Sequence, residues 1–124
     1  MARLTQALRA VPLVLVAGLA LSACGVGGAV TDARASCHLV TKAIKLQERS
    51  EAPGLTASQS ASLAAQAMAE LLKATPAAAA ATSTDGSWNA LMTTINEAER
   101  VPFDELIPSL TRLCRVADSS TPYL

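Results

Sequence analysis

The stretch from Thr56 to Ala74, TASQSASLAAQAMAELLKA, decides the fold class more clearly than any other part of the chain. Its apolar residues recur at spacings of three and four, the period of an amphipathic α-helix: Leu63, Ala64, Ala67, Met68, Leu71 and Leu72. Thr56 and Gln59 have the spacing of a capping box, and Lys73 stands in the last turn, where the helix dipole favours a cation. Pro76 either stops the helix or starts the next turn, so the stretch predicts a helix over 56–74.

Three more segments carry the same period. The segment 32–51 has an apolar stripe and is ended by Pro53-Gly54. The stripe consists of Cys37, Val40 and Ile44, with polar Gln47 at the next position of the same spacing, and is widened by Leu39, Ala43 and Leu46. The segment 87–99 has Trp88, Leu91, Met92 and Ile95 on one face. The segment 103–117 has Phe103, Leu106, Ile107, Leu110, Leu113, Cys114 and Ala117. Each segment is therefore predicted to be a helix packed on a shared core.

Two places leave the helix assignment open. Pro108 removes a backbone donor inside the segment 103–117, so we expect a kink there, or a short turn before the main helix. The five alanines 77–81 favour a helix by propensity but are too few to nucleate one alone, so they form either one docked turn or a linker. No segment alternates with period two, and the sequence predicts an all-α fold: a small bundle of four helices, or of three with one broken.

The amino-terminal residues have the order of an export signal. Arg3 and Arg9 precede an apolar run from Ala10 to Leu21, which is long enough for a signal peptide and too short to span a bilayer. The ending Leu21-Ser22-Ala23-Cys24 resembles a bacterial lipobox. That resemblance implies that Cys24 is joined to a diacylglycerol, that the signal peptide is cut just before it, and that the new amino terminus can be acylated, for example with palmitate. An ordinary secretory signal, with Cys24 as a free thiol, is the alternative.

These features divide the chain into four parts. We expect a cleaved signal peptide at 1–23, the lipidated cysteine and a short flexible tether at 24–31, a helical domain at 32–118 and a C-terminal tail at 119–124. The full sequence has 10 basic and 10 acidic residues, and loss of Arg3 and Arg9 leaves a net charge of −2. This balance argues against a nucleic-acid partner and against general attraction to anionic lipids.

If Cys24 carries lipid, Cys37 and Cys114 remain as a pair. An even pair in a small exported domain indicates a disulfide, which would place the first and fourth helices side by side. A metal site with His38 is a weaker alternative, because adjacent Cys37 and His38 diverge on a helix and no fourth ligand is evident. A redox role would favour a Cys-x-x-Cys pair, which the sequence lacks.

Catalytic motifs do not emerge from the sequence. His38 is the single histidine, and there is no phosphate-binding glycine loop, zinc-protease motif or EF-hand loop. Several acids lie with Arg100 around the junction of the third and fourth predicted helices: Glu97, Glu99, Asp104 and Glu105. We expect this junction to be solvated, with acid–base catalysis or cation binding as the alternative. We therefore expect a protein that is not an enzyme and has no cofactor or bound metal.

Two groups of residues are candidate contact sites. Arg34, His38, Lys42, Lys45 and Arg49 share one face of the first helix and could touch an anionic surface, although a solvated polar face is the simpler interpretation. Met68, Trp88 and Met92 could line a pocket for a hydrophobic ligand, although such residues usually form core.

The segment from Trp88 to Thr94, Glu99-Arg100-Val101-Pro102 and the pair Cys37 and Cys114 together resemble small exported lipoproteins of actinobacteria. That resemblance covers most of the mature chain and implies no activity and no functional residues. The sequence thus predicts a non-enzymatic lipoprotein, anchored to the bilayer through acylated Cys24 at the extracytoplasmic face of the cell membrane. We expect it to bind an envelope protein or polymer; the alternative is a carrier or sensor of a small hydrophobic ligand near Trp88.

Overall fold

The computed structural model describes residues 26–123, and within them every regular element is helical. The elements in chain order are α1 (Val26–Ser50), α2 (Ala57–Lys73), α3 (Thr75–Thr84), the 3₁₀ helix η1 (Gly86–Trp88), α4 (Asn89–Asn96), the 3₁₀ helix η2 (Glu97–Glu99) and α5 (Phe103–Asp118). The predicted small all-α bundle is confirmed. The predicted signal peptide and the lipidation site Cys24 lie outside the described residues.

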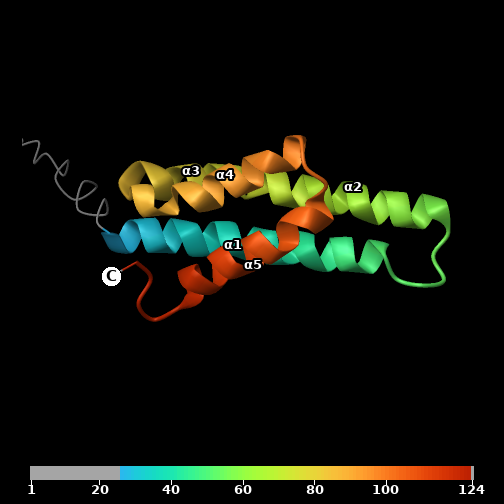
Figure 1. Ribbon diagram of the computed structural model, residues 1–124, viewed down its shortest axis with the longest axis horizontal. Helices are drawn as coiled ribbons and strands as arrows, with labels where there is room; N and C mark the ends of the chain where they lie inside the picture. Colours follow the sequence, from blue (N-terminus) through green and yellow to red (C-terminus); the bar gives the residue numbers. More distant parts are fainter. Residues whose placement is uncertain (1–25, 124) are drawn as a thin grey trace, which may run out of the picture.

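Helices α1 and α2 form a long antiparallel hairpin, and the other helices pack on only part of its length (Figure 1). Helix α3 continues in the direction of α2, α4 returns, and α5 runs back along α1 (Figure 1). The carboxyl end of α5 therefore lies beside the first turns of α1. The α1–α2 hairpin extends beyond the other helices at the opposite end of the molecule.

The turn between α1 and α2 follows from local chemistry. Gly54 has a φ of +86°, a left-handed conformation that costs a glycine nothing. The Thr56 hydroxyl then accepts the Gln59 N–H at 3.1 Å, while the Gln59 side-chain oxygen accepts the Thr56 N–H at 2.9 Å. This is the predicted capping box, and it satisfies two donors that the first turn of α2 would otherwise leave unpaired.

The alanine run forms a helix of its own, which resolves the open assignment of 77–81. Pro76 lies in the first turn of α3, where a missing N–H breaks no helical hydrogen bond. Ala78 and Ala81 are fully buried, and α3 packs extensively on α1. The tertiary contact with α1 thus stabilises a segment that propensity alone could not hold helical.

One expectation needs correction, and another is narrowed. Helix α1 begins at Val26, so residues 26–31 of the expected tether are helical, and Ala29 is fully buried. Helix α5 continues through Pro108, which excludes the short turn before the main helix and leaves the kink as the other expected alternative. Pro108 is exposed, and its ring therefore displaces no neighbouring element.

The core is made of small residues placed around a few large ones. Nine of the nineteen buried apolar residues are alanines, and these allow the helix backbones to approach closely. The largest fully buried side chains are Trp88, Leu71, Leu91, Ile95 and Leu110. Ser36 is also fully buried, and its hydroxyl donates to the Ala74 carbonyl at 3.0 Å, which ties α1 to the junction of α2 and α3.

Candidate functional site

A disulfide joins α1 to α5. The Cα atoms of Cys37 and Cys114 are 5.4 Å apart, within the usual range for this bond, and the two sulfurs are bonded. Both cysteines are buried, and the bridge closes a sequence separation of 77 residues. The predicted pairing and the predicted contact between the first and last helices are confirmed. Because each sulfur is committed to the other, neither is available as a metal ligand beside His38.

An open groove runs along this same α1–α5 interface. It has a volume of about 470 Å³, and its lining includes the disulfide half Cys114 and the side chain of Ile44. Four charged side chains border it, two basic and two acidic: Lys45, Arg115, Glu48 and Asp118. The remaining lining residues are Thr41 and Thr111. The groove therefore offers a small apolar floor between charges of both signs.

The basic face predicted on α1 is divided by contacts within the molecule. The Arg34 guanidinium donates to the Ala117 carbonyl at 2.8 Å and to the Ser119 carbonyl at 3.1 Å. Arg34 thus satisfies carbonyls at the end of α5, where the helix dipole favours a cation. Lys42 forms an ion pair with Glu70 of α2 at 3.9 Å. Lys45 and Arg49 form no ion pair with any described residue, so these two, with exposed His38, are the part of the predicted surface that stays available.

Glu70 connects α1 and α2 electrostatically. The Lys73 ammonium donates to Glu70 Oε1 at 2.9 Å, and that hydrogen bond, with the charges of Lys42 and Lys73, holds the pKa of Glu70 below its ordinary value. Sequence reasoning missed Glu70; its spacing of three from Lys73 on one helix is the signal that could have indicated that pair, whereas the Lys42 contact requires the α1–α2 pairing to be known. Its chemistry is that of a structural ion-pair cluster.

The residues proposed for a hydrophobic ligand lie in the core or pack against it. Trp88 is 1% exposed, and its ring packs edge-on against Tyr123 with centroids 4.7 Å apart. Met68 and Met92 are half-buried against the core. Neither the α1–α5 groove nor a second open groove of about 460 Å³ on α2, from Leu55 to Gln66, is lined by any of the three. These side chains pack as core rather than around a shared pocket.

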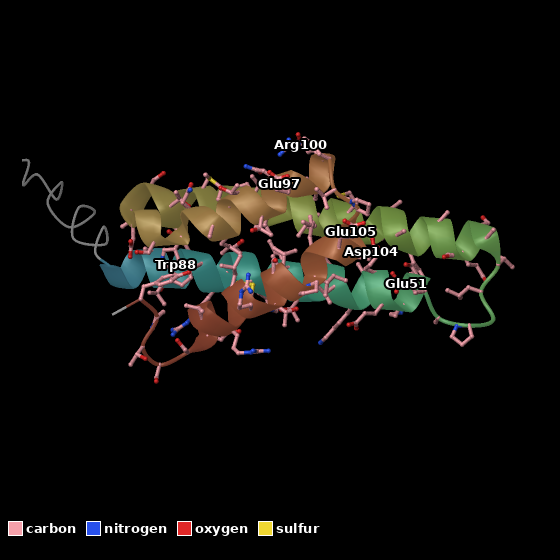
Figure 2. All side chains as sticks on the ribbon, in the orientation of Figure 1. Glu51, Trp88, Glu97, Arg100, Asp104 and Glu105 are labelled. Carbon is pink, nitrogen blue, oxygen red and sulfur yellow. A yellow bond between two sulfur atoms is a disulfide. The ribbon has the colours of Figure 1, made fainter. Side chains whose placement is uncertain are left out.

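The acidic junction lies on the surface, as expected. Arg100 pairs with Glu97, and both stand at the outer edge of η2, while Asp104 and Glu105 begin α5 (Figure 2). Acidic residues in the first turn of α5 interact favourably with the helix dipole. Within residues 26–123, no group of three or more His, Cys, Asp or Glu side chains is placed to hold a metal ion.

Comparison with protein-family models, with curated proteins and with solved structures finds no match to this chain. The fold and the site together define a small helical bundle closed by one disulfide, with an open groove of mixed charge beside it. In the part of the chain that the structure describes, no helix is both long and apolar enough to cross a membrane.

Proposed function

We propose that this protein is a lipid-anchored, non-enzymatic bundle that binds a protein partner at the extracytoplasmic face of the membrane. The observation that carries the proposal is the position of the disulfide-closed domain. It begins at Val26, two residues after the lipobox-like Cys24, and its Cys37–Cys114 bridge suits an oxidising compartment. Acyl chains on Cys24 would supply anchoring that the described helices do not.

The α1–α5 groove is the surface that supports partner binding best. A uniformly anionic polymer would meet Glu48 and Asp118 as well as Lys45 and Arg115, so attraction and repulsion would largely cancel along the groove. A protein segment with charges of both signs can match all four side chains and place an apolar residue on Ile44. The charge pattern therefore favours a protein over an envelope polymer.

The surroundings of His38 support a binding role over catalysis. His38 is exposed, and it forms no hydrogen bond with another described residue. A catalytic histidine is ordinarily oriented by a second side chain and placed beside a nucleophile or substrate. The thiol of Cys37, its neighbour in sequence, is consumed in the disulfide with Cys114.

Intact-mass spectrometry of protein extracted from native membranes tests the anchor. We expect loss of residues 1–23, a mass increase from acyl chains, and loss of two hydrogens at the disulfide. The variant Cys24→Ser should lack the acyl mass and leave the membrane fraction, whereas Ser22→Ala should behave as the parent protein. A mature protein without acyl mass would refute the anchor.

Photo-crosslinking in intact cells tests the groove. A crosslinking amino acid at exposed Thr41 or Thr111, on opposite walls of the groove, should give one discrete adduct of higher mass. The same amino acid at exposed Ala65 on α2 is the matched control and should not give it. The charge reversal Arg115→Glu should weaken the adduct. Equal adducts from Ala65 would show that the groove is not the binding surface, and a carbohydrate-containing adduct would identify a polymer instead.

A further inference from the structure

The start of α1 fixes how an anchored molecule would stand. This inference rests on the proposed function, because it takes Cys24 as the lipidated residue. Only Gly25 separates Cys24 from the first residue of α1, and one extended residue spans about 3.5 Å. A helical bundle held by so short a connection cannot stand away from the bilayer. The end of the bundle at which α1 begins must therefore lie next to the lipid headgroups.

Several segments distant in sequence meet at that end. The carboxyl end of α3, η1 and the start of α4 lie at the same end of the bundle as the first turns of α1, and the C-terminal tail returns to that end (Figure 1). Of these elements, α3 packs directly on α1. Arg34 holds the tail there through the Ser119 carbonyl. The opposite end carries only the turn of the α1–α2 hairpin. The two ends of the molecule thus differ in composition as well as in distance from Cys24.

Aromatic side chains gather at the end beside Cys24. The chain has three aromatic residues, and two of them, Trp88 and Tyr123, are in edge-to-face contact there (Figure 2 shows Trp88 at the end of the bundle where α1 begins). Tyr123 is 41% exposed, one of two exposed large hydrophobic residues in the described chain. Tyrosine and tryptophan are enriched at membrane–water interfaces because their rings combine an apolar body with a polar tip.

The polar groups around this pair suit the hydrated headgroup layer. The exposed side chains nearest in sequence to Trp88 and Tyr123 are uncharged: Ser83, Thr84, Ser87, Asn89, Ser120 and Thr121. Asp85 is the single charged residue of 82–89 and 119–123, and its carboxylate accepts the Ser87 N–H at 2.9 Å. The surface can therefore enter the headgroup layer without bringing a cluster of unpaired charges into it.

We infer that the end of the bundle formed by residues 82–89 and 119–123 is a membrane-docking surface for a phospholipid bilayer. Tyr123 lies at the headgroup level with Trp88 behind it, and the bundle stands upright on the membrane. Helix α1 has 25 residues, so the hairpin turn at 51–56 stands about 37 Å farther out. The α1–α5 groove then faces sideways and remains open to a partner above the membrane surface.

Hydrogen–deuterium exchange of the lipidated protein tests this orientation. The protein is measured in nanodiscs of phosphatidylcholine and phosphatidylglycerol and compared with Cys24→Ser mixed with the same nanodiscs. We expect slower exchange in residues 82–89 and 119–123 of the lipidated protein and unchanged exchange in the turn 51–56. Slower exchange in the turn, or along Lys45 and Arg49 of α1, would show that the molecule lies on its tip or its side and would overturn the inference.

Trp88 provides a second measurement, because it is the only tryptophan in the sequence. In nanodiscs with acyl chains brominated near the headgroup, its fluorescence should fall relative to ordinary nanodiscs. The variant Tyr123→Ala should reduce the docking protection at 82–89, whereas Leu72→Ala, at the other exposed large hydrophobic residue, should not.

The mass of the same sample separates the two proposals. Acylated protein without protection or quenching at this end would refute the docking surface and leave the anchor intact. Unacylated protein would refute the anchor itself.

Discussion

Reduction of the Cys37–Cys114 bridge should remove a large part of the stability of this domain. The bridge closes a separation of 77 residues, for which the chain-entropy relation gives about 4.5 kcal/mol at 25 °C. Domains of this size have total unfolding free energies of about 5–15 kcal/mol. The reduced protein should therefore unfold at much lower urea, with a Tm lower by about 20 °C or more.

The assay is urea unfolding of the Cys24→Ser protein, followed by the fluorescence of buried Trp88. It is performed with and without reductant, so that the loop-closure effect is measured without deletion of any atom. The double variant Cys37→Ala/Cys114→Ala should lose the same amount plus a packing contribution of about 1 kcal/mol for each buried sulfur removed.

Reductant must not change the double variant, which serves as the control for effects of the reagent. A difference of less than about 1 kcal/mol between reduced and oxidised parent protein would refute the reasoning. Such a result would mean that the unfolded state of the reduced chain is nearly as compact as that of the bridged chain, because contacts between α1 and α5 persist in it.

Four other perturbations test separate parts of the structure. Trp88→Ala should cost about 3–5 kcal/mol in urea unfolding followed by far-UV circular dichroism, because it empties the largest buried position, whereas Trp88→Phe should cost clearly less. Arg34→Met keeps the apolar stem but loses two hydrogen bonds to the end of α5, so exchange at 117–119 should accelerate while the turn 51–56 stays unchanged. Gly54→Ala should lower the free energy of unfolding by about 1 kcal/mol. No atom lies within 4 Å of the added Cβ, so backbone strain at φ +86° is the sole cause. An unchanged stability would contradict the turn conformation. The lowered pKa of Glu70 means that its contribution to stability is present above the ordinary pKa of 4.5 and is lost as the pH falls through the lower pKa of the folded state. Glu70→Gln should therefore flatten the acid limb of a profile of unfolding free energy against pH. An acid limb identical to that of the parent protein would refute the ion-pair assignment.

The elements that the sequence predicts well are those in which local and tertiary forces agree. Thr56 and Gln59 cap α2 because both partners lie within one turn, so spacing alone reveals them. The disulfide was predictable because only two cysteines follow Cys24, and counting leaves one intramolecular pair. In contrast, the helical state of the alanine run depends on burial of Ala78 and Ala81 against α1, which no local signal encodes.

The first turn of α1 shows that tertiary packing also overrides poor helix propensity. Gly27 and Gly28 have poor helix propensity, so the sequence predicted a flexible tether, yet both lie inside α1. Ala29 and Ala33 are each fully buried, and the packing of these two positions outweighs a cost of about 1 kcal/mol for each glycine. The early start of α1 also shortens the expected tether, because only Gly25 lies between Cys24 and Val26 in the sequence.

The basic face of α1 shows why a charge pattern on one helix does not define a binding surface. Arg34, Lys42 and Lys45 share that face by spacing, and periodicity treats them as equivalent. In the fold, Arg34 meets the carbonyl end of α5, Lys42 meets Glu70 on α2, and Lys45 borders the groove. The contacts of each cation depend on which helix packs beside it. Apolar contacts on the other side of α1 determine that packing. The charges therefore acquire different roles from the packing, and a single anionic partner that contacts all three would have to break two contacts that stabilise the bundle.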